Sequence, residues 1–127
     1  MNETPNGRKR ILVVDDESEA LEYITDALEE NYAVLTARSG KTALEILGGE
    51  RIDLVLLDIA MKEMDGNEAL WKIRNMPGKE NLLVCIVTAL MSPGQEKKSR
   101  DLGANDYLIK PFSIEKLLDT VAGLLGD

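Results

Sequence analysis

Five short aliphatic runs recur along this chain of 127 residues, and each is followed by a segment with helical periodicity. The runs lie at residues 11–14, 32–37, 52–57, 82–87 and 107–109. Consecutive Val, Ile and Leu residues without polar alternation are typical of strands that are buried on both faces of a parallel sheet. Parallel strands need crossover connections, which the intervening helices provide. The pattern therefore predicts an α/β domain with helices on both faces of the sheet.

The segments between the runs show apolar residues at spacings of three and four, as amphipathic helices do. Ser18 is the expected N-cap of a helix that runs to about Glu30. A second helix should end at Gly48-Gly49, and a third should begin near Gly66. The last helix should run from Ser113 to about residue 125. These elements predict a flavodoxin-like (βα)5 doubly wound parallel sheet with strand order 2-1-3-4-5.

The fourth helix, within residues 91–104, is unusually polar. Between Gln95 and Gly103 only Leu102 is a strong apolar anchor. A short helix with so little apolar surface should be marginally held. Two interpretations remain open: an ordinary solvated helix, which we favour, or a helix that moves when the protein changes state.

Composition places the chain among ordinary globular domains, with 44% apolar and 30% charged residues. We expect a disordered tail over residues 1–8 and one folded domain over residues 9–127. The net charge of −8 argues against direct binding to nucleic acid or to an anionic membrane. We find no apolar stretch of about 18 residues and no apolar segment of the kind found in signal peptides.

Cysteine and histidine usage restricts the chemistry further. Cys85 is the one cysteine, which excludes an intrachain disulfide and favours a cytoplasmic location. Because Cys85 lies within an aliphatic run, we expect a buried, inert thiol rather than a nucleophile. The sequence contains no histidine, which excludes histidine-based triads and histidine metal ligands.

Polar residues follow the predicted strands and should meet at one edge of the sheet. Asp15 and Asp16 follow the first strand and Asp58 follows the third, while no such residue is expected after the second. Thr88 and Lys110 follow the fourth and fifth strands. Any one of these residues is explained by turn or capping chemistry, but five at the same ends of four strands are not.

The charges of this group favour a divalent cation. Three ionised aspartates and one lysine leave a local charge of −3 + 1 = −2. Ligands that offer only oxygen favour Mg²⁺, or Mn²⁺ in its place, over zinc. A cation beside a hydroxyl and an ammonium suits a phosphoryl group, and a carboxylate is the available nucleophile. An acyl phosphate on Asp58 or Asp16 is the implied intermediate.

The sequence resembles the receiver domain of two-component response regulators from about Arg10 to Leu125. The motifs that carry the resemblance are ILVVDDES, LVLLDIAMKEMDG, IVTA and GANDYLIKPF. The resemblance implies a phosphoacceptor domain that receives a phosphoryl group from a sensor histidine kinase or a histidine phosphotransfer protein. It implies no enzymatic activity beyond self-catalysed aspartyl phosphorylation and dephosphorylation. The chain is expected to be either a stand-alone receiver or a part of a longer regulator.

The resemblance also implies roles for individual residues. Asp58 would be the phosphoacceptor and would bind Mg²⁺ together with Asp16 and the backbone carbonyl of Ala60. Asp15 would act mainly through a bound water. Because Ala60 and Leu90 offer no polar side chain to position an attacking water, we expect slow autodephosphorylation.

A second group of residues would sense the phosphoryl group. Thr88 and Lys110 would contact its oxygens, and Tyr107 would turn inward when Thr88 moves. Pro111 would follow a cis peptide bond. The fourth helix, fifth strand and fifth helix would form the face that contacts an effector or output domain. One departure from the family is Lys62, where proline is common, so the loop after Asp58 should be less rigid.

Three rival interpretations are less consistent with the residues. A haloacid-dehalogenase-like phosphohydrolase would need a second aspartate at position 60, which is alanine. A flavin-binding module would need a phosphate-binding loop after the first strand, where DDESEA is acidic. A pseudo-receiver scaffold would have no need for all five site residues.

Overall fold

The five aliphatic runs form one parallel sheet with the order β2-β1-β3-β4-β5, which confirms the predicted topology. The computed structural model describes residues 7–89 and 92–127. The strands are β1 (Arg10–Val14), β2 (Ala33–Ala37), β3 (Leu54–Leu57), β4 (Leu83–Thr88) and β5 (Asp106–Ile109). The first strand therefore lies inside the sheet, between β2 and β3.

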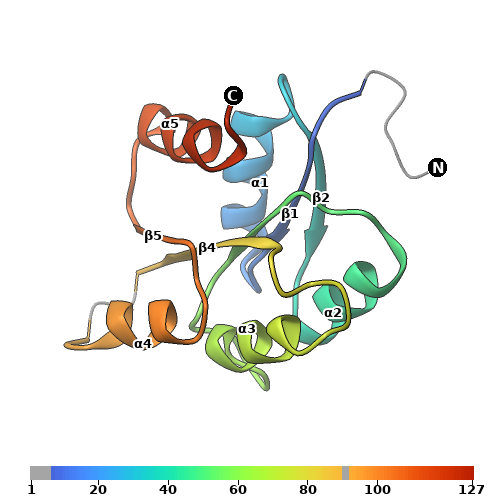
Figure 1. Cartoon of the computed structure of the whole chain (residues 1–127). Helices are drawn as coiled ribbons and strands as arrows, with labels where there is room; N and C mark the ends of the chain where they lie inside the picture. Colours follow the sequence, from blue (N-terminus) through green and yellow to red (C-terminus); the bar gives the residue numbers. More distant parts are fainter. Residues whose placement is uncertain (1–6, 90–91) are drawn as a thin grey trace.

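The helices form two layers, one on each face of the sheet (Figure 1). They are α1 (Ser18–Leu28), α2 (Gly40–Gly49), α3 (Gly66–Arg74), α4 (Gln95–Asp101) and α5 (Ile114–Leu125). Helices α1 and α5 pack together on one face, whereas α2 and α3 cover the other, on the side where α4 also lies. The predicted doubly wound arrangement is thus confirmed.

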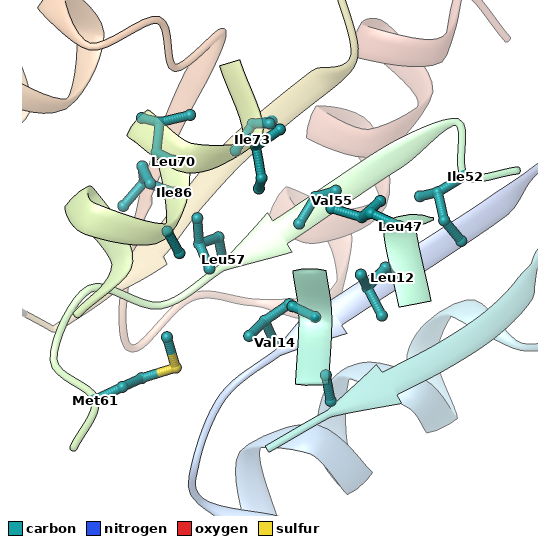
Figure 2. Close-up of a cluster of buried hydrophobic side chains, with 14 of the residues drawn as sticks. Leu12, Val14, Leu47, Ile52, Val55, Leu57, Met61, Leu70, Ile73 and Ile86 are labelled. Atoms are coloured by element: carbon teal, nitrogen blue, oxygen red, sulfur yellow. The ribbon is translucent and has the colours of Figure 1, made fainter. Parts of the chain in front are cut away.

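Alternate residues of the inner strands enter two separate cores. In β1, Leu12 and Val14 pack toward α2 and α3, in the core that Figure 2 shows in close-up. Ile11 and Val13 pack toward α1 and α5 on the other face. This division follows from the two-residue period of a strand, and it explains why every position of β1 from Ile11 onward is apolar. Burial of each such side chain contributes about 1.5–3 kcal/mol.

Three helices begin at side-chain caps. Ser39, Asp65 and Ser113 each accept a hydrogen bond from the backbone N–H three residues further along, at the start of α2, α3 and α5. A cap of this kind contributes about 0.5–2 kcal/mol. These caps fix the residue at which each of the three helices begins.

The predicted cap of the first helix is wrong. Ser18 is already helical, and the N-cap is Glu17, whose side chain makes no capping bond. The start of the helix differs because a side chain before it binds the backbone: Asp15 Oδ1 accepts a hydrogen bond from the backbone N–H of Glu17 at 3.0 Å. That bond shapes the turn after β1, so the helix begins before Ser18 is needed as a cap. The helix also ends at Leu28, two residues before the predicted end.

Helix α4 is attached to the rest of the domain through a buried polar residue. Ser99 is 0% exposed, and its hydroxyl donates to Asn67 Oδ1 of α3 at 2.9 Å. Asn67 is itself buried. The predicted apolar anchor, Leu102, is the C-cap residue, and its half-buried side chain packs against the hydrophobic core. Helix α4 is therefore held both by this apolar contact and by the buried hydrogen bond of Ser99.

Cys85 lies in the middle of β4 and is 0% exposed, as predicted. Burial, with a smaller contribution from the charge of Asp106, raises the pKa of its thiol to about 12. The thiol is therefore neutral at physiological pH, which is the inert state expected of a core cysteine.

The predicted tail over residues 1–8 falls mainly on residues 1–6, outside the part of the chain that the structure describes. Arg8 donates from Nη1 to the carbonyl of Glu29 at 2.8 Å. Among the described residues, none of the helices has the length and apolar character needed to span a bilayer.

Candidate functional site

The register of the sheet determines which residues meet beyond the strand ends. The last residue of β1 pairs with the last residue of β3, so Asp15 and Asp58 leave the sheet at the same level. On β4 the residue level with Asp58 is Val87, and Thr88 lies one residue further out. On β5, Lys110 lies one residue beyond the partner of Thr88. The polar residues therefore lie level on β1 and β3 and then move outward by one residue on β4 and again on β5.

The three aspartates form a compact cluster. One carboxylate oxygen from each of Asp15, Asp16 and Asp58 lies within 4.8 Å of the other two. Asp15 and Asp58 are 2% and 5% exposed, and Asp16 is half-buried. Asp16 and Asp58 line an open cleft of about 1000 Å³. Carboxylates this close repel one another unless a cation or a proton lies between them.

Lys110 supplies one positive charge to the cluster. Its Nζ atom lies 2.6 Å from Asp15 Oδ2 and 3.6 Å from Asp58 Oδ2. Burial acts to lower the pKa of this amine, but the hydrogen bond to Asp15 and the charge of Asp58 outweigh burial, so the pKa is raised. Lys110 is therefore an ammonium that spans two of the three carboxylates.

Asp58 is the carboxylate on which most contacts converge. Burial raises its pKa, and the neighbouring charge of Asp15 acts in the same direction. A hydrogen bond from Thr88, the charge of Lys110 and the backbone N–H of Ala60 oppose that rise only in part. The Ala60 nitrogen lies 3.3 Å from Asp58 Oδ1. The anionic form of Asp58 is thus under-stabilised, which favours the approach of a further positive charge.

The loop between β3 and α3 folds tightly over Asp58. The Gly66 N–H donates to the carbonyl of Ile59 at 2.9 Å, and Glu63 adopts a φ of 65°. A Cβ atom at position 66 would lie 2.1 Å from the backbone oxygen of Asp58. Only glycine permits this approach, so the first residue of α3 holds the backbone of Asp58 in place.

Thr88 and Tyr107 lie on neighbouring strands and on the same face of the sheet, because Tyr107 pairs with Ile86, two residues before Thr88. Thr88 is 0% exposed and directed at Asp58. Tyr107 is half-buried and lines a separate hollow against α4. Burial chiefly raises the pKa of its phenol, with smaller contributions from the charges of Glu96 and Asp58. The peptide bond between Lys110 and Pro111 is cis.

Two basic residues of the cleft were missed by the sequence reasoning. Arg38 directly follows β2 and lines the cleft, so the expectation that the second strand contributes nothing is wrong. The signal was available, because Arg38 follows its strand as Asp15 and Asp58 follow theirs. Lys62 lines the cleft from the loop after β3. The mouth of the cleft is therefore less acidic than the count of −2 suggests.

The donor set of the cluster fits Mg²⁺. Its ligand atoms are carboxylate oxygens, and the chain contains no histidine. Hard divalent cations prefer such ligands, whereas zinc prefers nitrogen and sulfur. The carboxylate of the buried Asp58, whose pKa is raised, is one that a bound cation would stabilise.

The fold and the site define an α/β domain in which a buried carboxylate, a hydroxyl and an ammonium meet beside an acidic cluster. The response regulator receiver domain family matches residues 11–122. The chain belongs to this family, whose members are the phosphoacceptor domains of two-component signal transduction.

Curated relatives agree with this assignment. A Vibrio cholerae protein named "Probable cyclic di-GMP phosphodiesterase" is 43% identical over 111 residues, which cover 87% of this chain and 25% of that protein. The response regulator MprA of Mycolicibacterium vanbaalenii is 38% identical over 117 residues, which cover 91% of this chain and 50% of that protein. The chain thus spans a quarter and a half, respectively, of the length of these two relatives.

Solved structures agree on the fold. A CheY-like receiver domain protein from Methanospirillum hungatei has a TM-score of 0.88 and 31% identity, with 94% of each chain covered. The chemotaxis protein CheY4 of Vibrio cholerae has a TM-score of 0.89 and 28% identity, with 93% of this chain and 99% of that chain covered.

Proposed function

We propose that Asp58 accepts the phosphoryl group of a phosphohistidine on a sensor histidine kinase or a histidine phosphotransfer protein. The observation that carries this proposal is the convergence of contacts on one carboxylate. Thr88 and Lys110 both contact Asp58. The backbone N–H of Ala60 contacts it from the loop. These groups are donors and a cation, which are what the oxygens of a phosphoryl group require.

The transfer itself needs little covalent chemistry from the protein. An oxygen of Asp58 attacks phosphorus as the P–N bond to the donor imidazole breaks. The imidazole nitrogen keeps the bonding electron pair and takes up a proton, and an acyl phosphate remains on Asp58. Burial of Asp58 favours this step, because its desolvated carboxylate is poorly stabilised as a free anion.

We propose that Asp16 and Asp58 hold Mg²⁺ together with the backbone carbonyl of Ala60, and that Asp15 contributes through a water. Mn²⁺ should substitute. When bound, the cation neutralises charge on the cluster and on the phosphoryl oxygens. Lys110 neutralises part of the remaining charge from the opposite side, where it contacts Asp15.

Phosphorylation changes the charge on Asp58 from −1 to about −2 and adds three acceptor oxygens. Lys110, now bound to Asp15, gains a stronger partner within reach. Thr88 follows the new oxygens, and Tyr107 turns inward from its half-buried position. We propose that this two-state change is transmitted to an effector or output domain through the face formed by α4, β5 and α5.

The self-catalysed formation and loss of the acyl phosphate is, in this proposal, the whole chemistry of the chain. The phosphodiesterase name belongs to a relative of which the chain spans a quarter. Ala60 offers no group to orient a hydrolytic water, which supports slow loss of the phosphoryl group; Leu90 lies outside the described residues. The net charge of −8 supports a partner protein rather than nucleic acid.

Phosphorylation by acetyl phosphate in Mg²⁺, followed by mass spectrometry of peptides, tests the acceptor. The label should map to Asp58, should vanish in Asp58→Asn and should require the divalent cation. Asp53→Asn, at the opposite edge of the sheet, is the matched control and should be labelled normally. A label that persists in Asp58→Asn, or that maps to Asp16, would overturn the assignment.

Beryllium fluoride, which mimics the phosphoryl group, tests the switch separately. The ring of Tyr107 should move inward in the complex, which NMR or crystallography would detect. An unmoved ring in a complex with fluoride bound at Asp58 would contradict the proposed coupling.

A further inference from the structure

Two other loops make hydrogen bonds to Asp16. The backbone N–H of Lys62, in the loop between β3 and α3, donates to Asp16 Oδ2 at 3.2 Å. Arg38, which follows β2, donates from Nη2 to the backbone carbonyl of Asp16 at 3.2 Å. The segments after β2 and β3 therefore both restrain the segment after β1.

Asp16 depends on these contacts more than its neighbours do. Asp15 and Asp58 are buried, and Lys110 lies close to both of them. Asp16 is half-buried and lines the open cleft. A carboxylate that is partly in solvent samples several rotamers unless a hydrogen bond selects one.

We propose that Lys62 and Arg38 are positioning residues for the divalent-cation site: the Lys62 N–H orients the carboxylate of Asp16, and Arg38 fixes the backbone that carries this carboxylate. This inference rests on the proposed function, which assigns the cation to Asp16 and Asp58. Lys62 acts through its backbone N–H, a group that every residue except proline supplies. The common family residue at this position, proline, would leave Asp16 without that bond, so this chain has a restraint that its sequence departure creates.

The expected effect follows from preorganisation. A ligand that is already oriented loses less conformational freedom when the cation binds. Outer contacts to metal ligands change affinity by about 10- to 100-fold, and at a solvent-facing carboxylate we expect a smaller effect, about three- to tenfold per contact.

The charges of the two residues act in the opposite direction from the hydrogen bonds. Both Lys62 and Arg38 are cations in the cleft and repel Mg²⁺. Removing either charge alone should therefore tighten Mg²⁺ binding. A loss of affinity on truncation can come only from the lost positioning.

Calorimetric titration with Mg²⁺ of the unphosphorylated chain tests the inference. Lys62→Pro and Lys62→Ala both lack the ammonium, but only Lys62→Pro lacks the N–H. Lys62→Pro should bind Mg²⁺ about three- to tenfold more weakly than Lys62→Ala, and Arg38→Ala should bind more weakly than the parent chain. Arg51→Ala is the matched arginine control, because Arg51 pairs with Asp53 at the opposite edge of the sheet. Thermal unfolding in EDTA verifies that each variant folds.

The rate of phosphorylation by acetyl phosphate, measured against Mg²⁺ concentration, gives a second readout. In Lys62→Pro, a higher Mg²⁺ concentration should be needed, but the rate at saturation should match that of Lys62→Ala. Equal Mg²⁺ affinities of Lys62→Pro and Lys62→Ala would overturn the role of Lys62. An Arg38→Ala affinity equal to or tighter than the parent would overturn the role of Arg38. A rate that stays low at saturation would show a distorted loop instead of lost positioning. A parent chain that binds no Mg²⁺ would overturn the cation site of the proposed function itself.

Discussion

Replacement of Ser99 by alanine should loosen α4, because the change removes the donor that satisfies a buried acceptor. Ser99 is 0% exposed and Asn67 is 6% exposed, so water has little access to the vacated Oδ1 of Asn67. An unsatisfied buried polar group costs about 1–3 kcal/mol. Alanine returns about 0.5 kcal/mol through its higher helix propensity. The net loss of about 0.5–2.5 kcal/mol should lower the Tm by roughly 2–10 °C in a domain of this size.

Hydrogen exchange shows which part of the domain loses stability in Ser99→Ala. Amides of α4 should lose protection to a greater extent than those of α1 or α5, because the broken bond joins α4 to α3. Lys98→Ala, at an exposed position of the same helix, introduces an alanine without removing a buried hydrogen bond. A cycle with Asn67→Ala should give a coupling of about 0.5–3 kcal/mol. If Ser99→Ala were as stable as Lys98→Ala and α4 kept its protection, the hydrogen bond would not be what holds this helix.

Three further outcomes follow from the site and the core. Gly66→Ala should lose about 1–3 kcal/mol and phosphorylate slowly, since its Cβ would lie 2.1 Å from the Asp58 oxygen. In Gly48→Ala the new Cβ meets nothing within 4 Å, so this variant should keep both its stability and its phosphorylation rate. Equal stabilities and rates of the two variants would refute the steric argument. In EDTA, Asp58→Asn should raise the Tm at pH 7, whereas exposed Asp119→Asn should not. The raised pKa means that the folded chain binds more protons than the unfolded chain, so stability falls as pH rises from 3.8 through the folded value. If Asp58→Asn instead lowered the Tm at pH 7, the ionised Asp58 would not be destabilising as proposed. Cys85, with a pKa of about 12, should react with a thiol reagent at pH 8 far more slowly in the folded chain than in urea; equal rates would contradict its burial.

Much of the fold could be predicted because burial leaves a regular trace in the sequence. The strands that are covered on both faces are aliphatic apart from Arg10, Cys85 and Thr88, and the sheet order follows once five strands alternate with helices. Asp15, Asp58, Thr88 and Lys110 were predicted to converge for the same reason, since each directly follows or ends a strand. The register then brings them together without any further signal.

The features that sequence reasoning missed depend on contacts between side chains and distant backbone. The cap of α1 shifted because Asp15 binds the Glu17 N–H, a competition that no periodic pattern records. Leu102 does pack against the core, as expected, but the second attachment of α4, a buried serine that is hydrogen-bonded to Asn67, was missed. A serine in a polar helix is indistinguishable from a solvated one until its partner is known.

The stepwise register also separates the parts of this domain that tolerate insertions from those that do not. Adding one residue within β3 would shift Asp58 relative to Asp15 and exchange the faces of the strand, which mixes the two cores. Adding residues where the chain enters β3 or β4, just after Gly49 at the end of α2 or around Gly78, would change neither relation, because these connections lie at the opposite edge of the sheet and a Cβ at either glycine meets open space. Peptide tags or inserted domains therefore belong at those two connections, where the domain can acquire new attachments while the acceptor geometry is inherited unchanged.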